Sequence, residues 1–280
     1  LTVVISPLIA LMKDQVDALR LNGVSAAFLN SSSDQVSQTL LMDDLRAGKI
    51  KLLYIAPERL STGLNYFLTI LKEVNVSLFA IDEAHCISHW GHDFRPDYLL
   101  LSKLKENFPA VPLIALTATA DKLTRSDIIE KLLLSNPRIF ISSFNRSNIR
   151  YIIEDKVDHY NRIIDFVEIH KNDSGIIYCL SRKNTEDLAE MLSDNGYNAL
   201  AYHAGLNSQT RNTRQEQFKR DEVKIIVATI AFGMGIDKSN VRYVIHSSIP
   251  KNIEGYYQET GRAGRDGLPS QALLFYSAGD

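Results

Sequence analysis

The stretch SLFAIDEAH, residues 77–85, decides the fold. Its four apolar residues, 78–81, run directly into Asp82 and Glu83 with no turn residue between them. A short run that is apolar at every position is typical of a strand buried on both faces of a parallel sheet. Open parallel sheets bind ligands at the carboxyl ends of their strands, so the two carboxylates are predicted to line a binding site.

Similar apolar runs recur along the chain, with helical patterns between them. They cover residues 2–5, 25–29, 50–55, 78–81, 113–117 and 139–142 in a first series, and residues 175–179, 199–202, 224–229, 242–246 and 272–276 in a second. This alternation indicates the α/β class, with parallel sheets covered by helices on both faces. A polar stretch, 142–148, separates the series. We predict two tandem doubly wound parallel-sheet lobes, residues 1–142 and 151–280, joined by a linker over residues 143–150.

Polar residues mark the predicted starts of three helices. Ser6 is expected to be an N-cap, with Pro7 at the first helical position. Ser33 and Asp121 precede helical patterns around residues 34–47 and 121–134. The helix after Ser6 and Pro7 would also present backbone N–H groups to a phosphate, although a simple cap explains the pair equally well.

The composition excludes several classes of protein. Of 280 residues, 45% are apolar and the formal net charge is −2, so any nucleic-acid surface must be local. Cys86 and Cys179 lie in separate halves, which suits a reducing compartment and offers no disulfide framework. No apolar stretch approaches the roughly 18 residues of a membrane span, so we expect no membrane partner and a cytoplasmic location.

The acidic pair has a chemical interpretation. In phosphoanhydride hydrolysis one carboxylate holds Mg²⁺, usually through water, and a second polarises the attacking water. Asp82 fits the first role and Glu83 the second. An isolated Asp-Glu pair would more simply be a solvated turn, but His85 and the segment CISHWGHDFRP, residues 86–96, favour the catalytic interpretation.

Residues 85–96 themselves have two competing interpretations. The cluster of His85, Cys86, His89 and His92 lacks the paired spacing that encloses a zinc ion, so no zinc is expected here. We favour a nucleic-acid contact loop, in which aromatic rings stack on bases and polar side chains supply hydrogen bonds or cation–π contacts. The rings are those of Trp90 and Phe94, and the polar side chains are His89, His92 and Arg95. A core position for Trp90 is the alternative.

Hydroxyl and basic residues end other predicted strands. Thr117 and Thr119 follow an apolar run and would relay a change at a nucleotide to the other lobe. Ser181 and Arg182 close the strand 175–179, and Thr229 closes the strand 224–229. At these positions they would touch a sugar–phosphate backbone.

The segment YQETGRAGRDG, residues 257–267, carries Arg262 and Arg265 in a glycine-rich frame. Arginine neutralises the charge that develops on a transferring phosphoryl group. We expect these two arginines and the acidic pair to meet around one triphosphate. The chain contains no GxxxxGK[ST] phosphate-binding loop, because Gly48 and Lys49 are followed by isoleucine and preceded by Asp43 where the first glycine should stand.

These segments, in this order, resemble the superfamily-two helicases and, more closely, the RecQ family. The matching segments are residues 5–15, 82–98, 116–120, 174–182, 202–206, 227–238 and 256–267. The resemblance implies two RecA-like lobes, a requirement for ATP and Mg²⁺, and 3′-to-5′ unwinding of single-strand and duplex junctions of DNA in repair and recombination.

The resemblance also implies roles for individual residues. Asp82 and Glu83 take the magnesium and water roles, and His85 helps to couple hydrolysis to strand contact. Arg265 resembles the family's arginine finger, with Arg262 as its partner. Residues 89–95 resemble the aromatic-rich loop that engages DNA. Further contacts with the nucleotide are implied for Gly235, Asp237 and Gln258.

The chain departs from the family pattern in several places. His89 stands where a glutamine is usual, Ser147 where a proline is usual, and Ser248 where an acidic residue is common. The adenine-reading segment and the phosphate-binding loop of family members are missing, so the first lobe is expected to be incomplete. The resemblance places the missing strand centrally, so two neighbours should lack a partner and the first lobe should be the less stable one.

Three hypotheses therefore compete. The first is an ATP-dependent DNA helicase, of which residues 1–280 alone hydrolyse ATP poorly. The second is an RNA helicase of the same superfamily, because motifs that grip phosphates do not distinguish the sugars. The third is a catalytically dead remnant that works by holding DNA.

Overall fold

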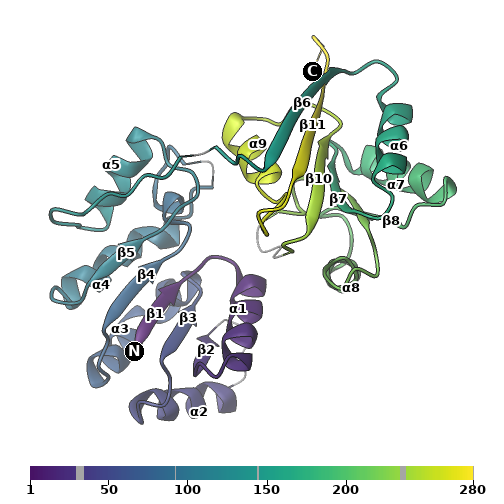
Figure 1. Ribbon diagram of the computed structural model, residues 1–280. Coiled ribbons are helices and arrows are strands. Elements are labelled where there is room, and N and C mark those ends of the chain that lie inside the picture. The colour runs from purple at the N-terminus through teal and green to yellow at the C-terminus, as the bar shows by residue number, and fades with distance from the viewer. Residues whose placement is uncertain (30–34, 92, 144, 234–237, 280) are drawn as a thin grey trace. The chain divides into compact units, whose positions relative to one another are not determined.

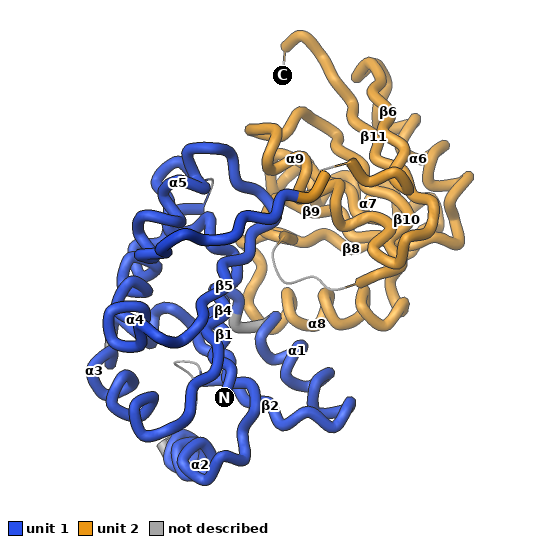
Figure 2. Tube along the Cα trace, turned by 60° about the vertical axis from the view of Figure 1, so that its left-hand side comes forward, with its two compact units in different colours: residues 1–141 blue, residues 142–280 orange. Residues whose placement is uncertain are grey.

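The computed structural model describes residues 1–29, 35–91, 93–143, 145–233 and 238–279. The chain divides into two compact units, residues 1–141 and residues 142–280, which are coloured separately in Figure 2. Each unit has its own parallel sheet and its own core.

Unit 1 alternates strands and helices. Its elements are β1 (Thr2–Ile5), α1 (Ile9–Leu21), β2 (Ala26–Leu29), α2 (Gln35–Arg46), β3 (Leu52–Ile55), α3 (Glu58–Glu73), β4 (Leu78–Ile81), the 3₁₀ helices η1 (Ala84–Ile87) and η2 (Pro96–Leu101), α4 (Ser102–Asn107), β5 (Leu113–Ala115) and α5 (Lys122–Lys131) (Figure 1). The strand order is β2-β3-β1-β4-β5, and every neighbouring pair is parallel.

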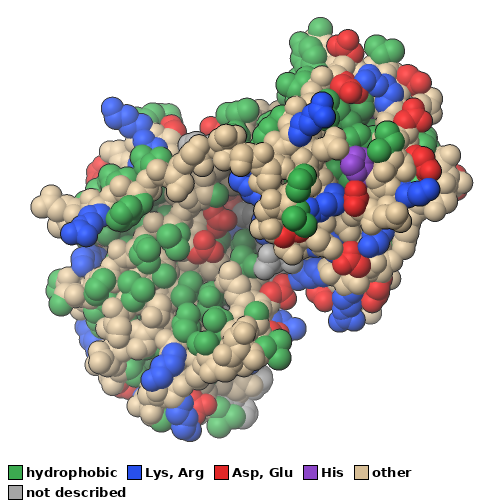
Figure 3. Space-filling model, in the orientation of Figure 1, with side chains coloured by type: hydrophobic (Ala, Val, Ile, Leu, Met, Phe, Trp, Pro, Cys, Tyr) green, Lys and Arg blue, Asp and Glu red, His purple; other side chains and the backbone are tan. Residues whose placement is uncertain are grey.

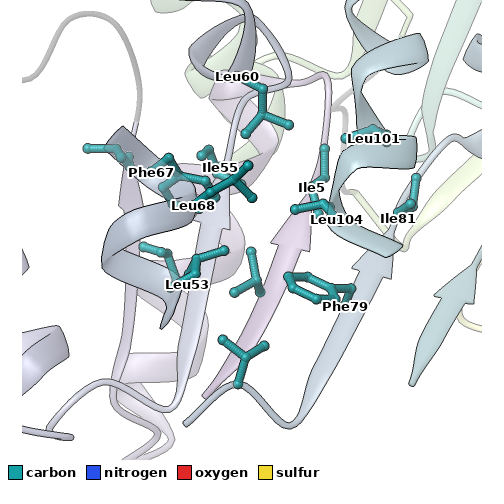
Figure 4. Packing of buried hydrophobic residues seen from close by; sticks show 14 of the residues in the cluster. Ile5, Leu53, Ile55, Leu60, Phe67, Leu68, Phe79, Ile81, Leu101 and Leu104 are labelled. Carbon is teal, nitrogen blue, oxygen red and sulfur yellow. The ribbon is translucent and has the colours of Figure 1, made fainter. Parts of the chain in front are cut away.

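The core of unit 1 lies mainly on one face of this sheet. Figure 4 shows Ile5, Phe79 and Ile81 of neighbouring strands packed against Leu60 of α3 and Leu104 of α4. All five side chains are at most 1% exposed. Full burial of such a side chain is worth about 1.5–3 kcal/mol, so this face fixes the position of β4 and of the acidic pair that follows it. Met12 and Val16 of α1 cover the opposite face.

The expected gap inside the first sheet is wrong. Central strand β1 pairs with β3 on one side and with β4 on the other, in register over four residues each. The edge strands of the described sheet are β2 and β5. At the β5 edge, Ile114 and Leu116 are 44% and 49% exposed.

Unit 2 repeats the architecture. Its elements are β6 (Ile149–Asp155), α6 (His159–Ile169), β7 (Ser174–Tyr178), α7 (Arg182–Asp194), β8 (Ala199–Tyr202), α8 (Ser208–Lys219), β9 (Ile225–Ala228), β10 (Val241–His246), α9 (Ile253–Thr260) and β11 (Ser270–Tyr276). The order is β6-β11-β10-β7-β9-β8, again all parallel.

Both faces of the second sheet are buried. Ile163 of α6 and Leu188 of α7 pack on one face, and Phe218 of α8 packs on the other. At the centre the Tyr243 ring lies directly over Gly175, where an added Cβ would be 1.9 Å from a ring carbon. Only glycine fits beneath this ring, so the doubly wound packing depends on this residue.

Three local predictions were wrong. Residues 139–142 form no strand, and Ile139, Phe140 and Ile141 are 56%, 87% and 62% exposed. The strand β6 was not predicted, and it begins inside the segment assigned to a linker. Ser6 is not an N-cap, because α1 begins at Ile9 after a Leu8 cap without a side-chain bond. The Asp121 cap is confirmed, since its carboxylate accepts a hydrogen bond from the Thr124 amide, and Ser33 lies outside the described residues.

The surface of unit 2 mixes charges of both signs. On the face shown in Figure 3, acidic and basic side chains are interspersed over this unit. This pattern agrees with the near-neutral net charge of the sequence. Among the described residues, no helix is long and apolar enough to cross a membrane.

Candidate functional site

The carboxylate of Asp82 is held in place at the carboxyl end of β4. Its Oδ2 accepts a hydrogen bond from the Ser6 hydroxyl at 3.1 Å, and its Oδ1 accepts one from the Glu83 amide at 2.9 Å. The buried Tyr98 hydroxyl donates to the Asp82 carbonyl oxygen at 2.9 Å. Ser6 follows β1, the neighbouring strand, directly, and Ile5 pairs with Ile81, so the sheet register brings the serine and the aspartate together.

Glu83 has an unusual backbone. Its φ and ψ are 47° and 44°, in the left-handed region, and it is followed by the 3₁₀ helix η1. For a residue with a side chain this conformation costs about 1–3 kcal/mol, and such strain gathers at functional sites. The two carboxylates of the pair have different neighbours: that of Asp82 contacts Ser6, and that of Glu83 lies beside His85, as would suit separate magnesium and water roles.

His85 connects the acidic pair to the end of β5. The imidazole is fully buried, and its Nδ1 lies 2.9 Å from the Thr117 Oγ1 and 3.3 Å from the Glu83 Oε2. The Thr117 hydroxyl donates to the Thr119 carbonyl oxygen at 3.0 Å, which leaves Oγ1 to accept from the imidazole. Both neighbours of Nδ1 are therefore acceptors, so we assign a proton to Nδ1. The structure thus brings together His85 and the two threonines that sequence reasoning chose as a relay.

The chemistry of the donor set fits a magnesium ion. Asp82 and Glu83 supply carboxylate oxygens, the ligand type that Mg²⁺ prefers. Within the described part of the chain, no group of three or more His, Cys, Asp and Glu side chains is arranged to enclose a metal. Mg²⁺ usually keeps several waters and binds through one or two carboxylates plus substrate phosphates, so one or two protein ligands are sufficient.

The loop after His85 is anchored at its base and exposed at its tip. The Ser88 hydroxyl donates to Asp127 of α5 at 2.7 Å, and Lys131 donates to the same carboxylate at 2.9 Å. Trp90 is 70% exposed, which argues against the core alternative. The His89 and Phe94 rings lie 3.7 Å apart. Sequence reasoning missed the two α5 anchors, because nothing near the loop in sequence indicates them.

Arg95, predicted to contact nucleic acid, has partners within unit 1. Its guanidinium donates twice to the Asp93 carboxylate, at 3.1 and 3.0 Å, and once to the Pro7 carbonyl oxygen at 3.3 Å. Its side chain is 25% exposed. In this arrangement Arg95 braces the loop against the segment after β1. His92 lies outside the described residues.

In unit 2 the two predicted arginines lie in one loop. We call residues 261–268, which follow α9, the arginine loop. Arg262 is buried, with 6% exposure, and Arg265 is exposed. Glu259 lies on α9, three residues before Arg262. Its buried carboxylate is 2.7 Å from Nε2 of the buried His246 at the end of β10. This pair, which sequence reasoning missed, ties α9 to the sheet next to the half-buried Gln258.

The predicted backbone contacts of unit 2 lie at the carboxyl ends of neighbouring strands. Ser181 follows β7 and caps α7, accepting a hydrogen bond from the Asn184 amide at 3.1 Å. Arg182, the first residue of α7, is exposed. Thr229 follows β9, which pairs with β7. The three residues therefore share one edge of the sheet, where open α/β folds bind ligands; Gly235 and Asp237 lie outside the described residues.

Comparison with known proteins matches each unit to a helicase family model. Residues 1–128 match the DEAD/DEAH box helicase family, and residues 155–267 match the helicase conserved C-terminal domain. The whole chain is 53% identical to the ATP-dependent DNA helicase RecQ of Pasteurella multocida and 46% identical to that of Bacillus subtilis. It is 46% identical to the RecQ-like DNA helicase BLM of Xenopus laevis.

The chain is similar over its whole length to helicases of the RecQ family. It spans 44%, 47% and 21% of the length of these three relatives. Solved structures share the fold of this chain. The helicase MrfA bound to DNA has a TM-score of 0.76 at 13% identity, covering 99% of this chain and 40% of that one. The DEAD-box helicase Mss116 bound to single-stranded RNA has a TM-score of 0.74 at 20% identity, covering 98% and 59%.

Departures from the RecQ pattern are accommodated locally. The His89 ring lies against the Phe94 ring at an interplanar angle of 31°, so a ring contact replaces the usual amide at this position. Ser248 accepts a hydrogen bond from Lys156 at 2.6 Å and donates to the Ser247 carbonyl oxygen at 2.9 Å. Ser147 is exposed. None of the three lies in the network of Asp82, Glu83 and His85.

Proposed function

We propose that the protein containing this chain is an ATP- and Mg²⁺-dependent DNA helicase that moves 3′ to 5′ and acts in repair and recombination. The observation that carries the proposal is the geometry after β4. A left-handed Glu83 follows an Asp82 that accepts a hydrogen bond from Ser6, and the buried His85 lies between Glu83 and Thr117. Bound Mg²⁺ would supply charge neutralisation and hold the phosphates of the nucleotide.

The residues of this chain would each have a distinct part. Asp82 would hold the metal through water, and Glu83 would orient and polarise the attacking water. Nδ1 of His85 lies 3.3 Å from the Glu83 carboxylate and 2.9 Å from the Thr117 hydroxyl, so a change in the position of Glu83 would alter the contact of His85 with the segment after β5. Arg262 and Arg265 would neutralise charge on the phosphoryl group in transit.

DNA contact would be divided between local groups. Exposed Trp90 would stack on a base, and the exposed Arg182 would neutralise a phosphate. The names of the RecQ relatives favour DNA as the partner. For residues 1–280 alone we propose slow ATP turnover, because the sequence has no GxxxxGK[ST] loop.

The test is DNA-stimulated ATP hydrolysis and strand separation by the full-length protein. Glu83→Gln should reduce turnover by about 100-fold or more while leaving DNA binding intact, since it removes the group that polarises water. Duplexes of DNA and RNA with 3′ single-stranded tails compare the two substrates. Unwinding of the RNA duplex alone would replace this proposal with the RNA helicase alternative, and DNA binding without any ATP hydrolysis would support the remnant hypothesis.

A further inference from the structure

The side chain of Arg146 reaches the backbone of the arginine loop. Its Nη1 donates to the Gly261 carbonyl oxygen at 3.2 Å. Its Nη2 donates to the carbonyl oxygens of Ala263 and Gly264, at 3.1 and 2.9 Å. One guanidinium thus holds three carbonyl groups within a span of four residues, although it lies 115 residues earlier in the chain.

Asn148 completes the contact two residues later. Its amide nitrogen donates to the carbonyl oxygens of Gly264 and Leu268, at 2.8 and 3.0 Å. Gly264 has a φ of 56°, and an added Cβ would lie only 2.4 Å from the amide nitrogen of Asn148. The glycine therefore allows both the left-handed turn and the close approach of the asparagine.

These bonds fix the backbone next to both arginines of the loop. The held carbonyls of Gly261 and Ala263 belong to the residues on either side of Arg262, and the held carbonyl of Gly264 belongs to the peptide that leads into Arg265. A guanidinium group presents several N–H donors in a rigid planar arrangement, whereas lysine carries all of its donors on a single ammonium nitrogen. Lysine at position 146 would keep the charge but could not reproduce this geometry.

We propose that Arg146 is a positioning residue for Arg262 and Arg265, and that Arg146 and Asn148 together form a clamp on the arginine loop. The role rests on the proposed hydrolysis of ATP. Groups that stabilise a transition state act best when they are held in position before the reaction begins, because no reorganisation is then required. The clamp supplies this rigidity through contacts with the backbone of the arginine loop and not with the side chains of its two arginines.

The first test is kinetic and uses the full-length protein with saturating DNA. Arg146→Lys and Arg146→Ala should each reduce kcat by roughly 100-fold, the scale expected for a misplacement of about 1 Å. The KM for ATP should change by less than about threefold, because the loss falls on the transition state. Free guanidinium should partly restore Arg146→Ala. The control is Arg150→Lys. Arg150 is exposed and lies four residues after Arg146, and within the described part of the chain its side chain makes no hydrogen bond or ion pair. A kcat of Arg146→Lys equal to that of wild type would overturn the proposal.

The second test does not depend on activity. Hydrogen exchange should be faster in residues 261–268 of Arg146→Lys and unchanged in residues 241–246 of β10, which reports that the unit is folded. Unchanged exchange in the loop would refute the clamp alone. A wild-type protein with a protected loop but no ATP hydrolysis would refute the proposed function, and with it the positioning role.

Discussion

Replacing Thr117 with valine should destabilise unit 1 by about 2 kcal/mol. The substitution keeps the shape of the side chain and removes one hydroxyl, which accepts from His85 Nδ1 at 2.9 Å and donates to the Thr119 carbonyl oxygen at 3.0 Å. The same oxygen also accepts from the Thr119 amide at 3.2 Å.

The magnitude follows from these three contacts. Each hydrogen bond contributes roughly 0.5–1.5 kcal/mol net, which would give about 1.5–4.5 kcal/mol for the set. Thr117 is only half-buried, so water can replace part of the contacts to Thr119. The imidazole of His85 is fully buried and cannot gain water in the same way. The estimate therefore stays near the lower part of the range.

The assay is hydrogen exchange of β4 amides at increasing urea concentration, which reads unit 1 separately from unit 2. With a urea dependence of roughly 2 kcal/mol per molar, the unfolding midpoint should fall by about 1 M. Thr69→Val is the matched control, because within the described part of the chain the exposed Thr69 hydroxyl donates one hydrogen bond, to the Asn65 carbonyl oxygen of its own helix. In the full-length protein the same variant should lose much of the DNA stimulation of ATP hydrolysis. A midpoint shift no larger than that of the control would refute the structural part of the reasoning.

Three further substitutions test other parts of the structure. Trp90→Ala should weaken the binding of single-stranded DNA by about 1–3 kcal/mol, measured by fluorescence anisotropy of a labelled strand. Because the Trp90 ring is 70% exposed, the free energy of unfolding should change by less than about 0.5 kcal/mol. Hydrogen bonds from Lys131 and, to a lesser extent, from Ser88 lower the pKa of Asp127 in the folded protein. The carboxylate therefore stabilises the fold above its unfolded pKa of 3.8, and this contribution is lost as the pH falls through the folded pKa. Asp127→Asn should consequently flatten the fall in unfolding free energy between about pH 5 and pH 2, and an unchanged slope would contradict this role. Gly175→Ala should lower the free energy of unfolding of unit 2 by at least about 1–3 kcal/mol, measured by thermal or chemical unfolding, because the added Cβ would overlap the Tyr243 ring. A variant as stable as the wild type would show that the ring moves aside without cost.

The apolar runs of the sequence predict most of the strands correctly because those strands are buried on both faces. The strand β6 escaped prediction because it is an edge strand in which Arg150, Glu154 and Asp155 interrupt the apolar pattern. The opposite error occurred at residues 139–142, where three apolar side chains follow one another without a strand partner in the described structure. Hydrophobicity alone does not reveal whether a neighbouring strand is present.

The acidic pair and the arginines were recognised from sequence because each forms a contiguous segment. Their supporting contacts were not, because the partners are far apart in the chain. Ser6 and Asp82 are separated by 76 residues, and His85 and Thr117 by 32. Ser6 was assigned to a local cap, since a serine before a proline suits that role, but the sheet register placed its hydroxyl beside a carboxylate instead.

The backbone after β4 and the backbone after β5 are joined by main-chain hydrogen bonds as well as by His85. The Leu116 amide donates to the Ile81 carbonyl oxygen at 2.8 Å, and the Ala84 amide donates back to the Leu116 carbonyl oxygen at 2.9 Å. Because both the amide and the carbonyl group of Leu116 are hydrogen-bonded to the segment after β4, the two segments can move very little relative to each other. The segment after β4 would sense hydrolysis, and the segment after β5 would respond to it. A change in either of these two segments therefore has to be matched by a change in the other.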